Sequence, residues 1–143
     1  MTTVVVDSSV ALKWFVPEIH SDKAASLLGG SVEITAPDLL YPEAGNVLWK
    51  KVTRGELSPE EVRDVVAALK RIPMAIAPSS SLLEGALEIA IAHERTVYDS
   101  LYVALAVARD CNFVTADDRL ANALAIGPLA EHVKKLSTYS TDP

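Results

Sequence analysis

Short runs of apolar residues alternate along the chain with longer segments in which apolar residues recur every three or four positions. A short run is typical of a buried strand, and the longer spacing is typical of a helix with one buried face. The pattern predicts strands at residues 3–6, 32–36, 74–77, 111–116 and 133–136. It predicts helices at residues 8–16, 20–29, 58–71, 80–93, 99–110 and 118–125, with a further helix between Asp38 and Gly55. This alternation indicates an α/β domain with a mostly parallel sheet.

Residues that start helices support two of these boundaries. Asp38 precedes the apolar stripe of its helix and is predicted to be the N-cap. Ser58 is followed by a proline in the first turn and by Glu61 three residues later, which is the pattern of a capping box. A well-capped helix after Ser58 is therefore expected.

Composition narrows the class of protein. The 143 residues are expected to form one domain, residues 1–143, with residues 137–143 as a frayed tail. The apolar runs are shorter than the roughly 20 residues of a membrane-spanning helix, so no membrane association is expected. The N-terminus lacks the features of a secretory signal, and the single cysteine, Cys111, has no partner in the chain. We therefore expect a cytoplasmic protein.

The net charge of −6, taken alone, argues against a protein that coats nucleic acid by bulk charge. Lys50, Lys51 and Arg54 nevertheless cluster near the end of one predicted helix, which allows a local basic patch. Lys50 is the member of this cluster that we expect to bind nucleic acid.

Four carboxylates stand at the ends of apolar segments, and the predicted fold brings them to one place. Asp7 and Asp117 directly follow strands. Glu43 lies in the first turns of the helix after the second strand, and Asp99 begins the helix that leads into the fourth strand. In a parallel sheet the crevice outside the carboxyl ends of the strands is the usual ligand site. All four acids can reach that edge.

Four acids in one crevice need compensation. Two carboxylates about 4 Å apart repel by about 4 kcal/mol at an effective dielectric constant near 20. Either some are protonated or a cation is bound. Oxygen ligands without a cluster of histidine or cysteine favour Mg²⁺ or Mn²⁺ over Zn²⁺. Such a site activates water and neutralises phosphate, which is the chemistry of many nucleases.

Polar neighbours of the acids are expected to support such a site. Ser9 and Thr115 stand beside acids and are predicted to orient them through hydrogen bonds. Asn46, three residues after Glu43, is predicted to share its helix face and to hold a water or a phosphate oxygen. No basic residue is expected inside the crevice, which makes it a receptor for a guanidinium group as well.

Four segments resemble the acidic motifs of PIN-domain ribonucleases, in the order and approximate spacing of that family. They are Val4–Ser9, Pro42–Leu48, Tyr98-Asp99 and Val114–Leu120. The resemblance covers nearly the whole chain, and the length is similar to that of VapC toxins of toxin–antitoxin modules. It implies a three-layer α/β/α fold, Mg²⁺- or Mn²⁺-dependent endoribonuclease activity, a homodimer, and inhibition by a small VapB-type antitoxin.

The resemblance also implies roles for single residues. The catalytic quartet consists of Asp7, Glu43, Asp99 and Asp117. Among these, Asp7, Asp99 and Asp117 match positions that hold the metal. Thr115 matches the hydroxyl that supports the fourth acid, and Asp118 is a possible extra member of the site.

Other interpretations of the same residues stay open at this point. Asp7, Asp99 and Asp117 are each suitable helix caps or first-turn acids. A PIN-like fold without catalysis could serve as a binding or scaffold subunit. A phosphatase with a phosphorylated Asp7 is a weaker alternative, because Ser9 stands where such phosphatases usually have a second acid.

Overall fold

The computed structural model describes residues 2–125 and 127–140, and its centre is a five-stranded sheet in the order β3-β2-β1-β4-β5. All neighbouring strands are parallel. The strands are β1 (Thr2–Val6), β2 (Val32–Pro37), β3 (Ala75–Ala77), β4 (Asn112–Thr115) and β5 (Val133–Lys135). The predicted α/β class and parallel sheet are confirmed.

Strand β1 occupies the middle of the sheet because its apolar run has no polar face. Val4, Val5 and Val6 are completely buried. Val5 lies beside Thr35 of β2 on one side and Phe113 of β4 on the other. A strand that is covered on both faces has a continuous run of apolar residues in its sequence, and β1 has such a run.

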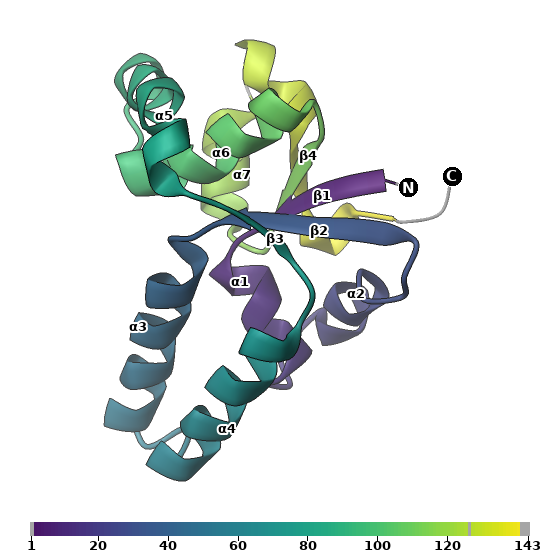
Figure 1. Ribbon diagram of the computed structural model, residues 1–143, viewed down its shortest axis with the longest axis vertical. Helices are drawn as coiled ribbons and strands as arrows, with labels where there is room; N and C mark the ends of the chain where they lie inside the picture. The colour runs from purple at the N-terminus through teal and green to yellow at the C-terminus, as the bar shows by residue number, and fades with distance from the viewer. Residues whose placement is uncertain (1, 126, 141–143) are drawn as a thin grey trace.

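Helices cover both faces of the sheet, as the expected three-layer fold requires (Figure 1). They are α1 (Ser8–Ala11), α2 (Ser21–Ser26), α3 (Leu40–Thr53), α4 (Pro59–Arg71), α5 (Ser79–His93), α6 (Val97–Arg109) and α7 (Asp118–Leu124). Helix α6 packs across β1, β2 and β4, and α5 packs on α6. Helices α3 and α4 form a pair that extends away from the sheet (Figure 1). None of the described helices is long and apolar enough to cross a membrane.

The helix predicted at residues 8–16 is shorter than expected. It ends as α1 at Ala11 and continues as a 3-10 turn at Leu12–Trp14. Pro17 limits the whole helical stretch, because a proline disfavours helical geometry at the residue before it and offers no N–H to continue the helix. The structure gives no local reason for the change to a 3-10 turn at Leu12.

The two helix caps have different outcomes. Ser58 caps α4 with the complete capping box, since its hydroxyl accepts from the Glu61 N–H at 3.0 Å and the Glu61 carboxylate accepts from the Ser58 N–H at 3.0 Å. The prediction for Asp38 is wrong, because α3 begins after Leu39 without a side-chain cap. The Asp38 carboxylate instead accepts hydrogen bonds from the N–H and the hydroxyl of Ser79. The parallel pairing of β2 with β3 brings this more distant partner beside it.

The C-terminal segment is described as far as residue 140. A 3-10 turn at Gly127–His132 precedes β5, and another at Leu136–Thr138 follows it. Tyr139 packs against the hydrophobic core. The rest of the expected tail, residues 141–143, lies outside the described residues.

Candidate active site: an acidic edge beside a lysine pocket

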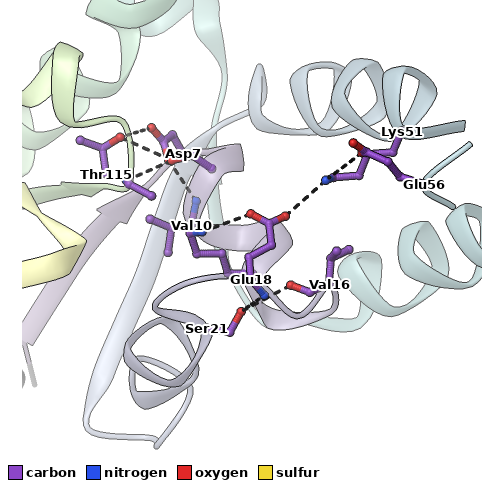
Figure 2. A network of polar contacts seen from close by, with 11 residues as sticks. Asp7, Val10, Val16, Glu18, Ser21, Lys51, Glu56 and Thr115 are labelled. Atoms are coloured by element: carbon purple, nitrogen blue, oxygen red, sulfur yellow. Dashed lines mark hydrogen bonds and ion pairs between the residues drawn. The ribbon is translucent and has the colours of Figure 1, made fainter. Parts of the chain in front are cut away.

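Asp7 is held at the carboxyl end of β1 by three hydrogen bonds (Figure 2). Its carboxylate accepts from the Ser9 hydroxyl at 2.5 Å, the Thr115 hydroxyl at 2.6 Å and the Val10 N–H at 3.2 Å. Asp7 is only 7% exposed. Burial raises the pKa of Asp7 above its ordinary value, and the three hydrogen bonds oppose this shift. The predicted hydrogen bond from Ser9 is therefore present, and it fixes the direction of the carboxylate.

Thr115 joins the ends of β1 and β4. Its hydroxyl donates to the Asp7 carboxylate and accepts from the backbone N–H of Asp117 at 3.0 Å, so its contact with the fourth acid is through the backbone. The Thr115 hydroxyl oxygen also lies 3.5 Å from the Ser9 hydroxyl oxygen. The register that pairs Val6 with Val114 brings these two strand ends together. Thr115 thus orients the first acid and positions the chain before the fourth.

Asp117 follows β4 and caps α7, since its carboxylate accepts from the Leu120 N–H at 3.1 Å. It is exposed, and its negative charge raises the pKa of both Asp7 and Asp99. Asp118 is also exposed, in the first turn of α7. Of this adjacent pair, Asp117 is the one that affects the other acids.

Glu43 and Asp99 come together from α3 and α6. With Asn46 they line one cavity of about 440 Å³, so Asn46 shares the Glu43 side of its helix as predicted. Both acids are half-buried. Burial raises the pKa of Glu43, and the charges of Asp7 and Asp99 raise it further. Burial also raises the pKa of Asp99, followed by the charge of Asp117.

We use "acidic edge" for the four residues Asp7, Glu43, Asp99 and Asp117. They belong to four separate segments of the chain. The charges of Asp7 and Asp99 raise the pKa of Glu43, and the charge of Asp117 raises the pKa of Asp7 and of Asp99. Within residues 2–125 and 127–140, however, no three His, Cys, Asp or Glu side chains are arranged to hold a metal ion. The acids share one electrostatic field without forming a closed set of ligands.

The interpretation of the acids as helix caps holds for some of them. Asp7 caps α1 and Asp117 caps α7. Asp99 is a first-turn acid, because the Thr96 hydroxyl caps α6 by accepting from the Asp99 N–H at 3.0 Å. Glu43 lies in the first turn of α3, which has no side-chain cap. Capping therefore does not account for the gathering of all four.

Tyr102 is a member of the site that the sequence analysis missed. Its hydroxyl donates to Glu43, and its ring stacks on Phe113 with a centroid distance of 5.5 Å. Burial and the nearby carboxylates raise the pKa of Tyr102, so it stays a donor. Its position three residues after Asp99 on one helix was the signal that could have revealed it.

A second cavity, of about 310 Å³, adjoins the acidic edge and contains two lysines. We call it the lysine pocket and define it by five lining residues: Ser9, Lys13, Glu18, Lys51 and Asp117. The expectation that no basic residue lies inside the crevice is therefore wrong at this end. Lys51 lines the pocket, whereas its neighbour Lys50 is exposed and does not.

Comparison with known proteins decides the family. A family model described as the PIN domain matches residues 4–124. This chain belongs to the PIN-domain family. Ribonuclease VapC3 of Pyrobaculum aerophilum is 34% identical over 120 residues, which cover 82% of this chain and 92% of that protein. Ribonuclease VapC1 of Mycobacterium tuberculosis is 41% identical over 92 residues, or 62% of this chain and 65% of that protein. The predicted resemblance to VapC ribonucleases, a group of hydrolases, is confirmed.

Solved structures agree on the PIN fold. PAE2754 from Pyrobaculum aerophilum superposes with a TM-score of 0.72 at 20% identity, covering 96% of this chain and 85% of that chain. VapC20 of Mycobacterium tuberculosis is described as a toxin that cleaves the sarcin–ricin loop. It superposes with a TM-score of 0.62 at 16% identity, covering 84% of this chain and 94% of that chain. At these identities the likeness concerns the fold.

Proposed function

We propose that this PIN domain is a Mg²⁺- or Mn²⁺-dependent endoribonuclease that hydrolyses RNA phosphodiester bonds and acts as the toxin of a toxin–antitoxin pair. The observation that carries the proposal is the acidic edge, in which Asp7, Glu43 and Asp99 have raised pKa values partly because of other acids. Its relatives bear the name VapC ribonuclease, which supports RNA as the substrate.

The donor groups of the edge fit a hard divalent cation. They are carboxylate oxygens, and their mutual repulsion is the kind of cost that a bound cation relieves. Asp7, Asp99 and Asp117 are the residues that would hold the ion. When bound, the ion would supply Lewis-acid stabilisation of the phosphate and lower the pKa of a water.

The chain's own residues would prepare the reaction. Ser9 and Thr115 hold both oxygens of Asp7, so this carboxylate cannot rotate freely. Tyr102 orients Glu43, whose raised pKa suits a group that accepts a proton from an attacking water. Asn46, in the same cavity as Glu43 and Asp99, would bind a phosphate oxygen or a water.

Cleavage of RNA with and without metal tests this function. The protein is incubated with structured RNA in Mg²⁺, in Mn²⁺ and in EDTA, and the products are separated on a denaturing gel. Cleavage is expected in either metal and none in EDTA, with Asp99→Asn inactive. Equal cleavage in EDTA would contradict the metal mechanism. Tight RNA binding without cleavage under any condition would support the alternative of a silent scaffold subunit.

Two apolar surfaces support the proposed protein partners. Leu83, Leu87 and Ile91 follow one another at helical spacing along α5 and are 47–70% exposed, which supports a homodimer. A cavity of about 380 Å³ between α3 and α4 has the exposed Trp49 and Val66 in its lining and suits an apolar segment of a VapB-type antitoxin. An arginine of that partner would match the acidic edge.

Growth of a host cell tests the toxin role. Expression of the chain alone, in the cytoplasm of the host, should arrest growth, and co-expression of its antitoxin should restore growth.

A further inference from the structure

The lysine pocket contains a carboxylate bound between two ammonium groups. Glu18 Oε2 lies 3.2 Å from Lys13 Nζ, and Glu18 Oε1 lies 3.5 Å from Lys51 Nζ (Figure 2). The two lysines come from the 3-10 turn after α1 and from α3, and Glu18 comes from the segment between them in sequence. Each oxygen of one anionic group therefore has its own cation.

Lys13 is the more deeply buried of these two lysines. Its side chain is only 7% exposed, and a buried ammonium is costly unless it is paired. Within the described residues, Glu18 is its only hydrogen-bond partner, although an ammonium group can donate three hydrogen bonds. Lys13 thus keeps donor capacity for further oxygen atoms.

Glu18 is the most exposed of the three side chains, and the hydrogen bonds next to it hold its backbone. Its side chain is 35% exposed, compared with 7% and 20% for the two lysines. Its backbone N–H donates to the Ser21 hydroxyl at 2.9 Å, and that hydroxyl donates to the Val16 carbonyl at 3.4 Å. The backbone is held by these bonds, so the side chain can turn into solvent without moving the loop.

The pocket shares Ser9 and Asp117 with the proposed catalytic site. Ser9 is one of the residues that hold Asp7, and Asp117 is a member of the acidic edge. A strand of nucleic acid that places one phosphate at the acidic edge has its neighbouring phosphate close by along the same chain. Of the two cavities beside the edge, only this one offers cations among its described lining residues.

We propose that the lysine pocket binds the RNA backbone phosphate adjacent to the one that is cleaved, and that Glu18 occupies the position of this phosphate when no RNA is bound. The proposal rests on the proposed ribonuclease function. A phosphate presents two oxygens to two cations as the carboxylate does, and it replaces Glu18 between Lys13 and Lys51. Glu18 then lowers the affinity for RNA by competing for the lysines. Contacts of the protein with the rest of the RNA supply the free energy that displaces Glu18.

Binding measurements in EDTA separate this role from cleavage. Fluorescence anisotropy follows a labelled single-stranded RNA over a series of KCl concentrations, for the full-length protein and for variants whose melting curves show that they are folded. Lys51→Met should weaken binding about tenfold and reduce the slope of log K against log salt by about 0.7. The matched control, Lys50→Met, removes the same charge from the next residue. The sequence analysis favoured Lys50 as the binding residue, but Lys50 is exposed and outside the pocket, so its loss should change affinity by less than about twofold.

Glu18→Gln gives the sharper result because it should improve binding. Removing the competing anion should tighten RNA binding by at least about threefold, whereas a merely structural ion pair predicts no gain. Glu56→Gln is the control, since Glu56 also pairs with Lys51, at 3.6 Å, but does not line the pocket. The double variant Lys13→Met with Glu18→Gln tests Lys13 without leaving a carboxylate unpaired. It should not show the tighter RNA binding expected of Glu18→Gln alone.

The outcomes distinguish the pocket from the nuclease. If the wild-type protein binds RNA but Glu18→Gln binds no more tightly, or if Lys50→Met is as harmful as Lys51→Met, the pocket assignment is wrong and the nuclease stands. If Glu56→Gln tightens binding as much as Glu18→Gln, the effect is one of general charge and the assignment is likewise wrong. If the wild-type protein neither binds nor cleaves RNA, both proposals fail.

Discussion

The acidic edge and the lysine pocket lie side by side, and they differ in how the fold treats charge. At the acidic edge, like charges are kept together, and the pKa values of Asp7, Glu43 and Asp99 are raised. In the lysine pocket, two cations share Glu18 as a counter-ion. The first arrangement is relieved by adding a cation, and the second can exchange its carboxylate for another anion. A divalent metal and a phosphate are therefore complementary to adjacent parts of one surface.

The largest expected effect concerns a single carboxylate of the acidic edge. Asp7→Asn should lower RNA cleavage by more than about a hundredfold, because even partners of metal ligands typically contribute 10- to 100-fold. Asp64→Asn, on an exposed face of α4, should have almost no effect. Initial cleavage rates in Mg²⁺ measure both variants. If they lose activity equally, the acidic edge has no special role.

The next largest effect is expected at Thr115, whose hydroxyl links the ends of β1 and β4. Thr115→Val keeps the shape of the side chain but removes a donor to Asp7 and an acceptor for the Asp117 N–H. Cleavage should fall about 10- to 100-fold, and the free energy of unfolding should fall by about 1–3 kcal/mol because buried polar groups lose their partners. Thr53→Val, whose hydroxyl is exposed at the end of α3, is the control. Unchanged activity in Thr115→Val would show that the orientation of Asp7 is unimportant.

Metal binding should stabilise the acidic edge itself. At a concentration of Mn²⁺ about 100 times its Kd, the folded state gains about 2.7 kcal/mol. This corresponds to a rise in Tm of roughly 5–10 °C for a domain of this size. Differential scanning fluorimetry with and without EDTA measures the rise, and Asp99→Asn should reduce it. A rise of the same size in Asp99→Asn would place the ion elsewhere.

The smallest effect concerns the metal-free protein, and its sign follows from the pKa shift. The pKa of Asp99 lies above its ordinary value of 3.8, so ionisation of this group destabilises the fold. Its favourable contribution is complete below pH 3.8 and is lost as the pH rises through the raised pKa. In EDTA at neutral pH, Asp99→Asn should therefore be more stable than the wild type by up to about 1 kcal/mol, because solvent screens a half-buried group.

The pH dependence provides the control for this last prediction. The advantage of Asp99→Asn should shrink toward acid pH and vanish below about pH 4. Melting curves in EDTA across this range measure the difference. If the wild type is the more stable protein at neutral pH, Asp99 stabilises the fold as a first-turn acid. The idea that repulsion among the acids destabilises the metal-free fold would then be refuted.

The sequence analysis was most successful where one stretch of chain determines the outcome. All five strands were predicted, and the capping box at Ser58 was identified from adjacent residues. It was less successful where a distant partner competes with a local one. Asp38 has the chemistry of an N-cap, but Ser79 takes its carboxylate, and nothing near Asp38 in the sequence indicates this.

What the sequence by itself determined is the set of elements and the acids that follow them, because apolar periodicity and strand-end polarity are properties of neighbouring residues. Only the tertiary structure decided the partners. The register of β1 with β4 brings the Thr115 hydroxyl to Asp7, and the packing of α1 on α3 brings Lys51 near the segment that holds Lys13 and Glu18. These contacts join residues far apart in the chain, and their geometry depends on how the whole core packs.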